Sequence, residues 1–127
     1  MTSVGWLLDD DKKTFTMEDL KSFGVIFETV EEEKLTEFCQ DLKIGIQNSF
    51  IDMTPENYET AMKGGFTEHF HDYDEIRYVM NGDCLFDIRD KNDQWIRIEF
   101  PKTTFFIIPS GCYHRFKGKE NFLKLRK

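Results

Sequence analysis

The spacing of apolar residues changes from a helical repeat to an alternating one near the middle of the 127-residue chain. In the first half, Leu35, Phe38 and Leu42 recur at steps of three and four residues within a charged segment. This spacing predicts a helix over residues 31–44 that lays one face on a core. After Gly65, apolar and polar residues alternate over short runs, which is typical of strands with one buried face.

Residues that start and stop helices refine the prediction for the first half. Thr16 can cap a short helix that Gly24 ends, and residues 25–30 then form a strand. A further helix is expected to begin where Thr54 is followed by a proline and to stop at Gly64. The N-terminal half is therefore expected to combine helices with at least one strand.

Turn signals divide the second half into short strands. Asn81-Gly82 is a type I′ signal, so residues 75–80 and 83–89 are expected to pair as a β-hairpin. Three more strands follow, separated by turns: residues 95–100, 105–108 and 112–116. Many short strands at regular spacing indicate a β-sandwich or jelly roll. We therefore expect a mainly β domain with the N-terminal helices packed outside it.

Composition and charge narrow the class of protein. Hydrophobic residues make up 39% of the chain and aromatic residues 15%, with 13 Phe, which predicts a globular domain with a Phe-rich core. Twenty-four acids against 17 bases give a formal net charge of −7, which argues against binding to nucleic acid. The sequence has neither a secretory signal nor an apolar run long enough to cross a bilayer. We expect one domain over residues 1–127, with no membrane partner.

Three cysteines, Cys39, Cys84 and Cys112, are widely spaced and odd in number. This pattern predicts neither a disulfide framework nor a CxxC site, and it fits reduced thiols in a cytoplasmic protein, present also in the nucleus if the source is eukaryotic. By strand parity Cys84 and Cys112 can face inward, where thiols could join histidines in a zinc site. We favour the alternative that they are small buried residues, because the two lack close spacing.

Two of the three histidines lie one residue apart in the segment EHFHDYDEIRY. In an extended strand alternate side chains share a face, so His69 and His71 point the same way, about 7 Å apart along the backbone. The same parity places Glu75 and Arg77 on that face. In a helix His69 would lie nearly opposite His71, so only an extended segment unites them with the carboxylate. His114, which follows a Pro-x-Gly turn, is available as a third imidazole.

These side chains favour a metal centre over the alternative of surface histidines in a solvated acidic loop. Two imidazoles and a carboxylate suit non-haem iron, and a third imidazole favours an octahedral Fe(II), Ni(II) or Mn(II) ion. Arg77 either pairs with Glu75 or, where Glu75 binds metal, offers a permanent cation to an anionic substrate oxygen; we favour the second role. Phe116 shares strand parity with His114 and can line the same cavity.

The spacing HxHxxxE, a glycine after six further residues, and a later PxGxxH resembles the two motifs of the cupin superfamily. Within it, the stretch EHFHDYDEIRYVMNGDCLFDIRDKNDQWIRI followed by IIPSGCYHRF is similar to the acireductone dioxygenase family. The resemblance is specific over residues 68–116. It implies a single cupin jelly-roll β-barrel, with residues 1–65 as a part with helices and a strand and residues 66–127 as the metal-binding strands.

The resemblance also implies a ligand set and substrate contacts. One Fe(II) or Ni(II) ion per chain is expected, without an organic cofactor, on four ligands: His69, His71, Glu75 and His114. Arg77 matches the arginine that stabilises the anionic substrate. Phe116 and Phe66 are expected to contact the substrate, Phe66 because Gly65 occupies the place where the family usually has a phenylalanine.

The resemblance implies a reaction as well. The family oxidises acireductone, 1,2-dihydroxy-3-keto-5-methylthiopentene, with O2 in methionine salvage; the Fe(II) form yields 4-methylthio-2-oxobutanoate and formate, and the Ni(II) form yields carbon monoxide. Two alternatives stay open: a catalytically weak cupin that binds metal with a small ligand or a protein, and a cupin isomerase for another enediol or sugar. Family members continue past the third histidine, so the shorter C-terminus at Lys127 predicts a more open site and a monomer or weak homodimer.

Overall fold

The computed structural model of the chain describes residues 3–47 and 49–127. Its strands are β1 (Ser3–Leu7), β2 (Thr14–Thr16), β3 (Ile26–Thr29), β4 (Phe50–Met53), β5 (Glu75–Asn81), β6 (Cys84–Arg89), β7 (Trp95–Phe100), β8 (Thr104–Ile108), β9 (His114–Gly118) and β10 (Leu123–Arg126). Its helices are α1 (Met17–Ser22), η1 (Glu32–Lys34), α2 (Leu35–Asp41) and α3 (Tyr58–Gly65). The mainly β fold that the sequence predicts is confirmed.

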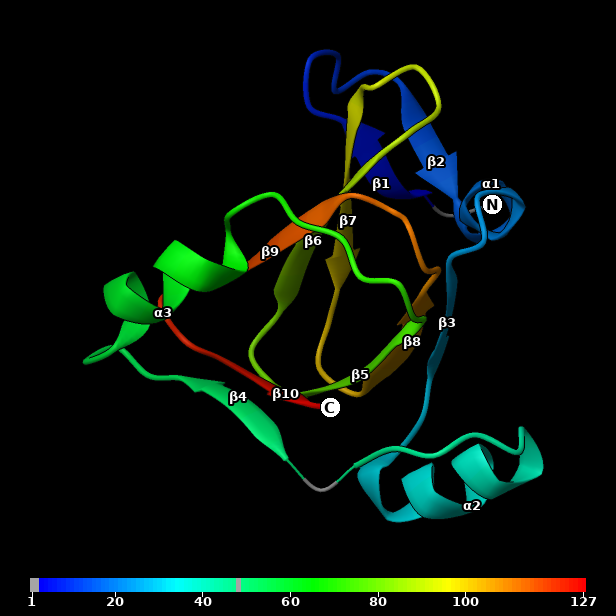
Figure 1. The fold of residues 1–127 in the computed structure, drawn as a ribbon, viewed down its shortest axis with the longest axis vertical. Coiled ribbons are helices and arrows are strands. Elements are labelled where there is room, and N and C mark those ends of the chain that lie inside the picture. The colour runs from blue at the N-terminus through cyan, green and yellow to red at the C-terminus, as the bar shows by residue number, and fades with distance from the viewer. Residues whose placement is uncertain (1–2, 48) are drawn as a thin grey trace.

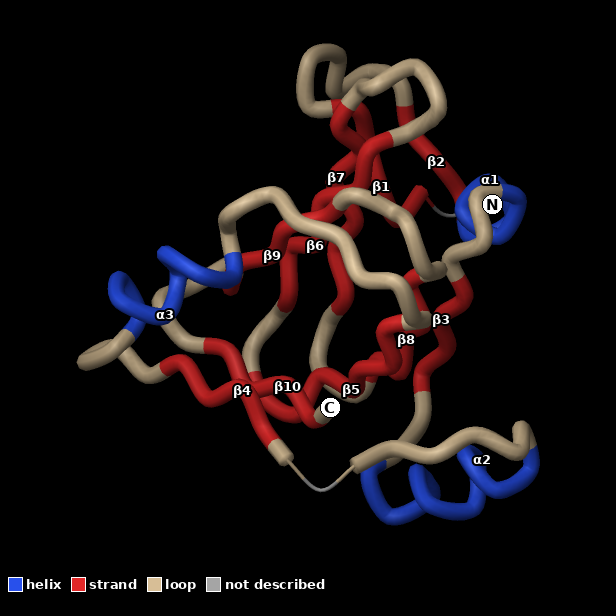
Figure 2. Tube along the Cα trace, viewed as in Figure 1, coloured by secondary structure: helices blue, strands red, loops and turns tan. Residues whose placement is uncertain are grey.

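Two five-stranded antiparallel sheets form a cupin-like barrel (Figure 1). One sheet has the strand order β2-β1-β7-β6-β9, and the other has the order β3-β8-β5-β10-β4. Figure 2 shows that the helices lie at the periphery of the barrel, as expected. No helix in the two described ranges is long and apolar enough to cross a bilayer.

Aromatic and β-branched side chains fill the space between the sheets. In β7, Ile96, Ile98 and Phe100 are buried while the residues between them are half-exposed, as a strand with one core face requires. The ring of Phe86 stacks parallel to that of Phe116 at 6.0 Å between centroids. The Phe-rich core predicted from composition is therefore present.

A second apolar cluster lies between α2 and the outer side of the other sheet. Leu35 and Cys39 are buried there, and the ring of Phe105 is fully covered. Leu42, expected on this helix face, is 49% exposed because α2 ends one residue before it and the chain turns at Lys43, which has a positive φ of 59°. Cys39 takes the buried position instead.

The starts of the other two helices were predicted with different success. Thr16 caps α1 as predicted, and Gly24 follows the helix with a positive φ of 88°. α3 begins at Tyr58, later than the predicted start at Thr54. The delay arises because the Asn57 side chain accepts a hydrogen bond from the Thr54 backbone N–H at 2.8 Å and closes a separate turn.

The predicted hairpin about Asn81-Gly82 is wrong. β5 pairs with β8 and β10, whereas β6 pairs with β7 and β9 in the other sheet. A type I′ turn needs positive φ at both central residues, and of this pair only Gly82 has it, at 77°. A Cβ at Gly82 would lie 2.8 Å from the Phe122 carbonyl oxygen. The glycine therefore lets the chain cross between the sheets close to Phe122.

Four strands lie outside the sequence prediction: β1, β2, β4 and β10. They are three to five residues long and too short to show a clear alternating pattern. β9 begins at His114, two residues later than expected, because the turn after Pro109 extends through Gly111, whose φ is 79°, to Cys112. The strands on either side of the candidate site are thus only partly those that the sequence predicts.

Candidate metal centre

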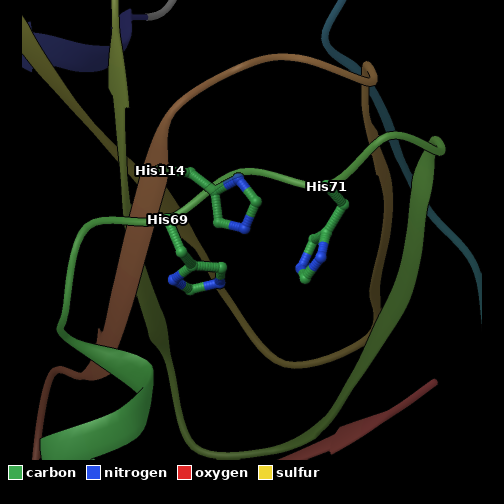
Figure 3. A group of neighbouring side chains, drawn as sticks. All are labelled: His69, His71 and His114. Atoms are coloured by element: carbon green, nitrogen blue, oxygen red, sulfur yellow. The ribbon is translucent and has the colours of Figure 1, made fainter.

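All three histidines of the chain converge on one point (Figure 3). One ring nitrogen from each of His69, His71 and His114 lies within 4.8 Å of the others. His69 and His71 come from the segment before β5, and His114 comes from β9. The predicted strand over His69 and His71 does not form; His69 alone makes an isolated bridge, to His114. An irregular extended segment brings the two imidazoles together.

Backbone hydrogen bonds hold that segment against β9 and the turn before it. The backbone N–H of His69 donates to the His114 carbonyl at 2.9 Å, and the return bond measures 2.8 Å. The N–H of Gly111 donates to the His71 carbonyl at 2.8 Å. The two motifs of the sequence, HxHxxxE and PxGxxH, therefore lie side by side.

Two backbone carbonyls set which ring nitrogen of the imidazoles is free. Nδ1 of His69 lies 2.7 Å from the Thr67 carbonyl oxygen, and Nδ1 of His114 lies 2.9 Å from that of Cys112. A carbonyl oxygen only accepts hydrogen bonds, so each Nδ1 carries the proton. The Nε2 atoms of both rings are then left with a lone pair for a metal ion.

Glu75, the first residue of β5, adds a carboxylate to the cluster and is only 3% exposed. Its Oε2 lies 3.0 Å from Nε2 of His114, and its Oε1 lies 3.6 Å from Nε2 of His71. Among the described residues, neither Oε2 of Glu75 nor Nε2 of His114 has a hydrogen-bond partner, although both atoms are buried.

Buried polar atoms without a partner are rare, and two lone pairs that face each other repel. A cation between them removes both problems. Adjacent ligands of an octahedral ion lie about 3.0 Å apart when each bond is about 2.1 Å long, which matches the separation of these two atoms. The residues present therefore fit a divalent metal ion.

The protonation states of the site also suit a metal. Burial alone raises the pKa of Glu75, but its neighbours, among them the cation of Arg77, outweigh burial and lower that pKa below the ordinary value. Burial lowers the pKa of His71, although Glu75 partly opposes the shift. An anionic carboxylate and a neutral imidazole are the forms that bind metal ions.

Arg77 pairs with Glu75 and also lines the cavity beside the histidines. Its guanidinium nitrogen Nη2 lies 2.6 Å from Oε1 of Glu75, and Nη1 donates to the Ile76 carbonyl at 2.8 Å. The same side chain lines the cavity next to the histidines. The ion pair therefore fixes the guanidinium at the site without removing it from the cavity.

The cavity beside the histidines has a volume of about 310 Å³. Its polar lining includes His69, His71, Glu75 and Arg77. Its apolar lining comes from β4, α3 and β9: Ile51, Met53, Ala61 and Phe116. The cavity is therefore suited to a small molecule with a polar head and an apolar tail.

The structure does not bring Phe66 to this cavity. The guanidinium carbon of Arg115 lies 4.4 Å from the centroid of the Phe66 ring. This contact is on the outer face of the sheet that contains β9. Tyr73, which sequence reasoning missed, lines the cavity and stacks on His71 at 4.8 Å. Lys127 was missed as well. Neither has a periodic signal because both lie outside regular strands.

Cys84 and Cys112 are not part of the cluster of ligand atoms found in the described residues. Cys84 is fully buried in the core, where burial raises its pKa. Burial also raises the pKa of Cys112, to about 11. Cys84 is therefore a small buried residue, as expected, whereas Cys112 is only partly buried against the core.

Comparison with known proteins places these observations in a family. A sequence profile of the ARD/ARD′ family matches residues 7–126. The chain is 37% identical over 125 residues to the acireductone dioxygenase of Branchiostoma floridae. The match covers 92% of this chain and 70% of the Branchiostoma protein. It is 32% identical over 148 residues to acireductone dioxygenase 4 of Arabidopsis thaliana. That match covers 100% of this chain and 79% of the Arabidopsis protein.

A solved structure shares the fold. Acireductone dioxygenase from Bacillus anthracis, with a cadmium ion in its active centre, superposes with a TM-score of 0.80 and covers 98% of this chain and 91% of that one. The two sequences are 15% identical, so this likeness concerns the fold alone.

Proposed function

The chain belongs to the acireductone dioxygenase (ARD/ARD′) family, and from this premise we propose that it is a metal-dependent dioxygenase acting on acireductone. With iron it oxidises this substrate with O2 to 4-methylthio-2-oxobutanoate and formate, a step of methionine salvage. The observation that carries the proposal is the partnerless pair of buried atoms, Oε2 of Glu75 and Nε2 of His114, within a cluster of three imidazoles.

Four residues would hold one Fe(II) or Ni(II) ion: His69, His71, Glu75 and His114. Three imidazoles and one carboxylate would accept either metal. When bound, the ion supplies Lewis-acid and template chemistry to the enediol oxygens and O2. No residue of the site calls for an organic cofactor.

Arg77 binds and orients the anionic form of the substrate. Its side chain is 13% exposed, so the charge acts where water screens it little and stabilises an anionic oxygen more strongly than in bulk solvent. The pair with Glu75 holds the guanidinium in place before the substrate arrives.

The apolar wall of the cavity receives the methylthio tail. Ile51, Met53 and Phe116 belong to the lining, so a tail placed against them is shielded from water while the enediol end meets the histidines. The volume of about 310 Å³ lies at the lower end of the range for small-ligand pockets, which suits a substrate of this size.

The interleaving of strands supports one cupin domain over residues 1–127. β1 and β2 belong to the same sheet as β6, β7 and β9, while β3 and β4 belong to the same sheet as β5, β8 and β10. The N-terminal half therefore supplies strands to both sheets of the barrel, and neither half completes a sheet without the other.

Oxygen consumption tests the proposed activity. The protein is reconstituted anaerobically with Fe(II), acireductone is generated in place, and products are identified by mass spectrometry. We expect formate and 4-methylthio-2-oxobutanoate, and carbon monoxide with Ni(II). Uptake no faster than the uncatalysed rate, with metal bound, would support a binding protein instead. Isomerised enediol without oxygen uptake would support an isomerase.

A further inference from the structure

The segment that carries His69 has a second set of contacts on the outer face of the sheet β2-β1-β7-β6-β9. Phe66 and Glu68 reach this face, while His69 points to the metal centre. The segment forms no regular strand, and its one strand-like pairing is an isolated bridge at His69. Side-chain contacts therefore contribute to holding it in place.

Arg89 holds Glu68 with two hydrogen bonds. Nη2 of Arg89 donates to Oε1 of Glu68 at 3.1 Å, and Nε donates to Oε2 at 3.3 Å. The guanidinium is itself held, since Nη1 donates to the Asp93 carbonyl at 2.8 Å and the guanidinium carbon lies 4.5 Å from the Trp95 ring centroid. This two-point contact fixes a direction as well as a distance.

Arg115 holds Phe66 in a parallel manner. Its guanidinium carbon lies 4.4 Å from the Phe66 ring centroid and 4.2 Å from that of Trp95. Nε of Arg115 donates to Asp87 at 2.9 Å, and Asp87 is fully buried in the sheet. Both arginines thus share the Trp95 ring, and the set is anchored to the barrel.

Thr67 lies between these two held residues. Its carbonyl oxygen accepts the Nδ1 proton of His69 at 2.7 Å, and its hydroxyl donates to the Lys63 carbonyl at 2.6 Å. With Phe66 and Glu68 both fixed, the peptide of Thr67 has little freedom to rotate. The direction of its carbonyl, and through it the tautomer of His69, then follows from the outer-face contacts.

We propose that Arg89 and Arg115 are positioning residues for the metal centre. By holding Glu68 and Phe66, they keep the Thr67 carbonyl on Nδ1–H of His69, which leaves Nε2 of that ring free for the ion. The inference rests on the proposed metal-binding function but not on the identity of the substrate.

The test uses Glu68→Gln, which removes the charge and one of the two acceptor oxygens that Arg89 contacts, and Phe66→Leu, which removes the ring under Arg115; Asp87 and the arginines stay in place. The matched control is Glu99→Gln. Glu99 forms an ion pair with Lys119 at 3.2 Å on the same sheet and is 34% exposed, against 35% for Glu68. Loss of a surface ion pair as such affects both variants alike.

Two readouts separate positioning from simple stability. Side-chain ¹⁵N NMR of the metal-free protein reports which nitrogen of His69 carries the proton, and competition titration reports Ni(II) affinity. We expect Glu68→Gln and Phe66→Leu to populate the second tautomer of His69 and to weaken Ni(II) binding between about twofold and tenfold. Glu99→Gln should change neither.

A His69 tautomer and a Ni(II) affinity that match those of the Glu99→Gln control in both variants would overturn the inference. The tautomer readout needs no metal and no turnover, so it distinguishes failure of this inference from failure of the proposed function. A protein that binds Ni(II) with the expected dependence on Glu68, yet does not oxidise acireductone, would keep the inference and reject the enzyme assignment.

Discussion

Two carboxylates are buried in the sheets, and their surroundings differ. Asp87 is 0% exposed and both of its oxygens are paired: Oδ1 with Nε of Arg97 at 2.7 Å, and Oδ2 with Arg97 and with Arg115, each at 2.9 Å. Glu75 is 3% exposed, and its Oε1 pairs with Arg77, but its Oε2 faces His114 without a hydrogen bond.

The comparison shows which property distinguishes these two buried carboxylates. Burial alone does not separate the two residues, and both have an arginine partner. What separates them is their hydrogen bonding: both oxygens of Asp87 accept hydrogen bonds from arginines, whereas Oε2 of Glu75 accepts none from the described residues. In this sense Glu75 is the incomplete carboxylate, and it is the one beside the three histidines.

Removal of the complete carboxylate should have the largest effect on stability. Asp87→Ala leaves two largely buried guanidinium groups without their counter-charge, so we expect the free energy of unfolding to fall by about 3–5 kcal/mol. Urea unfolding of the metal-free protein measures this loss, with Glu99→Ala as the exposed control. A loss below about 1 kcal/mol, within the range of surface pairs, would contradict the role of Asp87.

Removal of the cation beside the incomplete carboxylate should affect turnover rather than the fold. Arg77→Ala is expected to keep the bound metal and to lower kcat/KM by about 10²–10³, because a preorganised charge at the anionic substrate oxygen is lost. Metal content and oxygen uptake are measured on the same sample. Undiminished turnover would show that Arg77 serves only to pair with Glu75.

A metal ion should stabilise the folded protein through the incomplete cluster. At a free concentration 100 times its Kd, an ion that binds only the folded state adds about 2.7 kcal/mol. Thermal unfolding with and without Ni(II) measures the gain, and His114→Ala should abolish it together with the bound metal. Unchanged metal content in that variant would contradict the four-ligand set.

Acid should weaken the metal-free cluster by a smaller amount. Because burial lowers the pKa of His71, the unfolded chain binds a proton there first, so stability is lost as pH falls below about 6.5. The lowered pKa of Glu75 has the same sign and acts below about 4.3.

The His71 contribution is at most about 1.4 kcal/mol for each pH unit. Urea unfolding at pH 7.5 and pH 5.5 measures it, and His71→Asn should show a smaller drop. An equal drop in the variant would assign the effect to other groups.

The sequence predicts the residues of the site better than the path of the chain. Strand parity was the argument that placed His69, His71 and Glu75 together, and they do lie together, although residues 70–74 form no strand. The hairpin at Asn81-Gly82 failed because a two-residue turn signal carries no information about Phe122, which lies beside it in space.

Partners that come from distant segments left no local signal. Phe66 was assigned to the substrate from its place near the first histidine, yet its ring contacts Arg115, which follows it by many residues. Tyr73 lies in an irregular stretch without periodicity, and only the structure places it on His71. Contacts of this kind are set by tertiary packing and cannot be read from spacing.

We interpret the missing hydrogen bond at Oε2 of Glu75 as the mark of a metal ligand. Calorimetric titration with Ni(II) tests this interpretation on the unsubstituted protein, on Glu75→Gln and on Glu99→Gln, whose carboxylate pairs with Lys119 away from the histidines. We predict one ion per chain for the unsubstituted protein and for Glu99→Gln, and affinity at least about 100-fold weaker for Glu75→Gln. Equal affinity of Glu75→Gln and the unsubstituted protein would contradict the account.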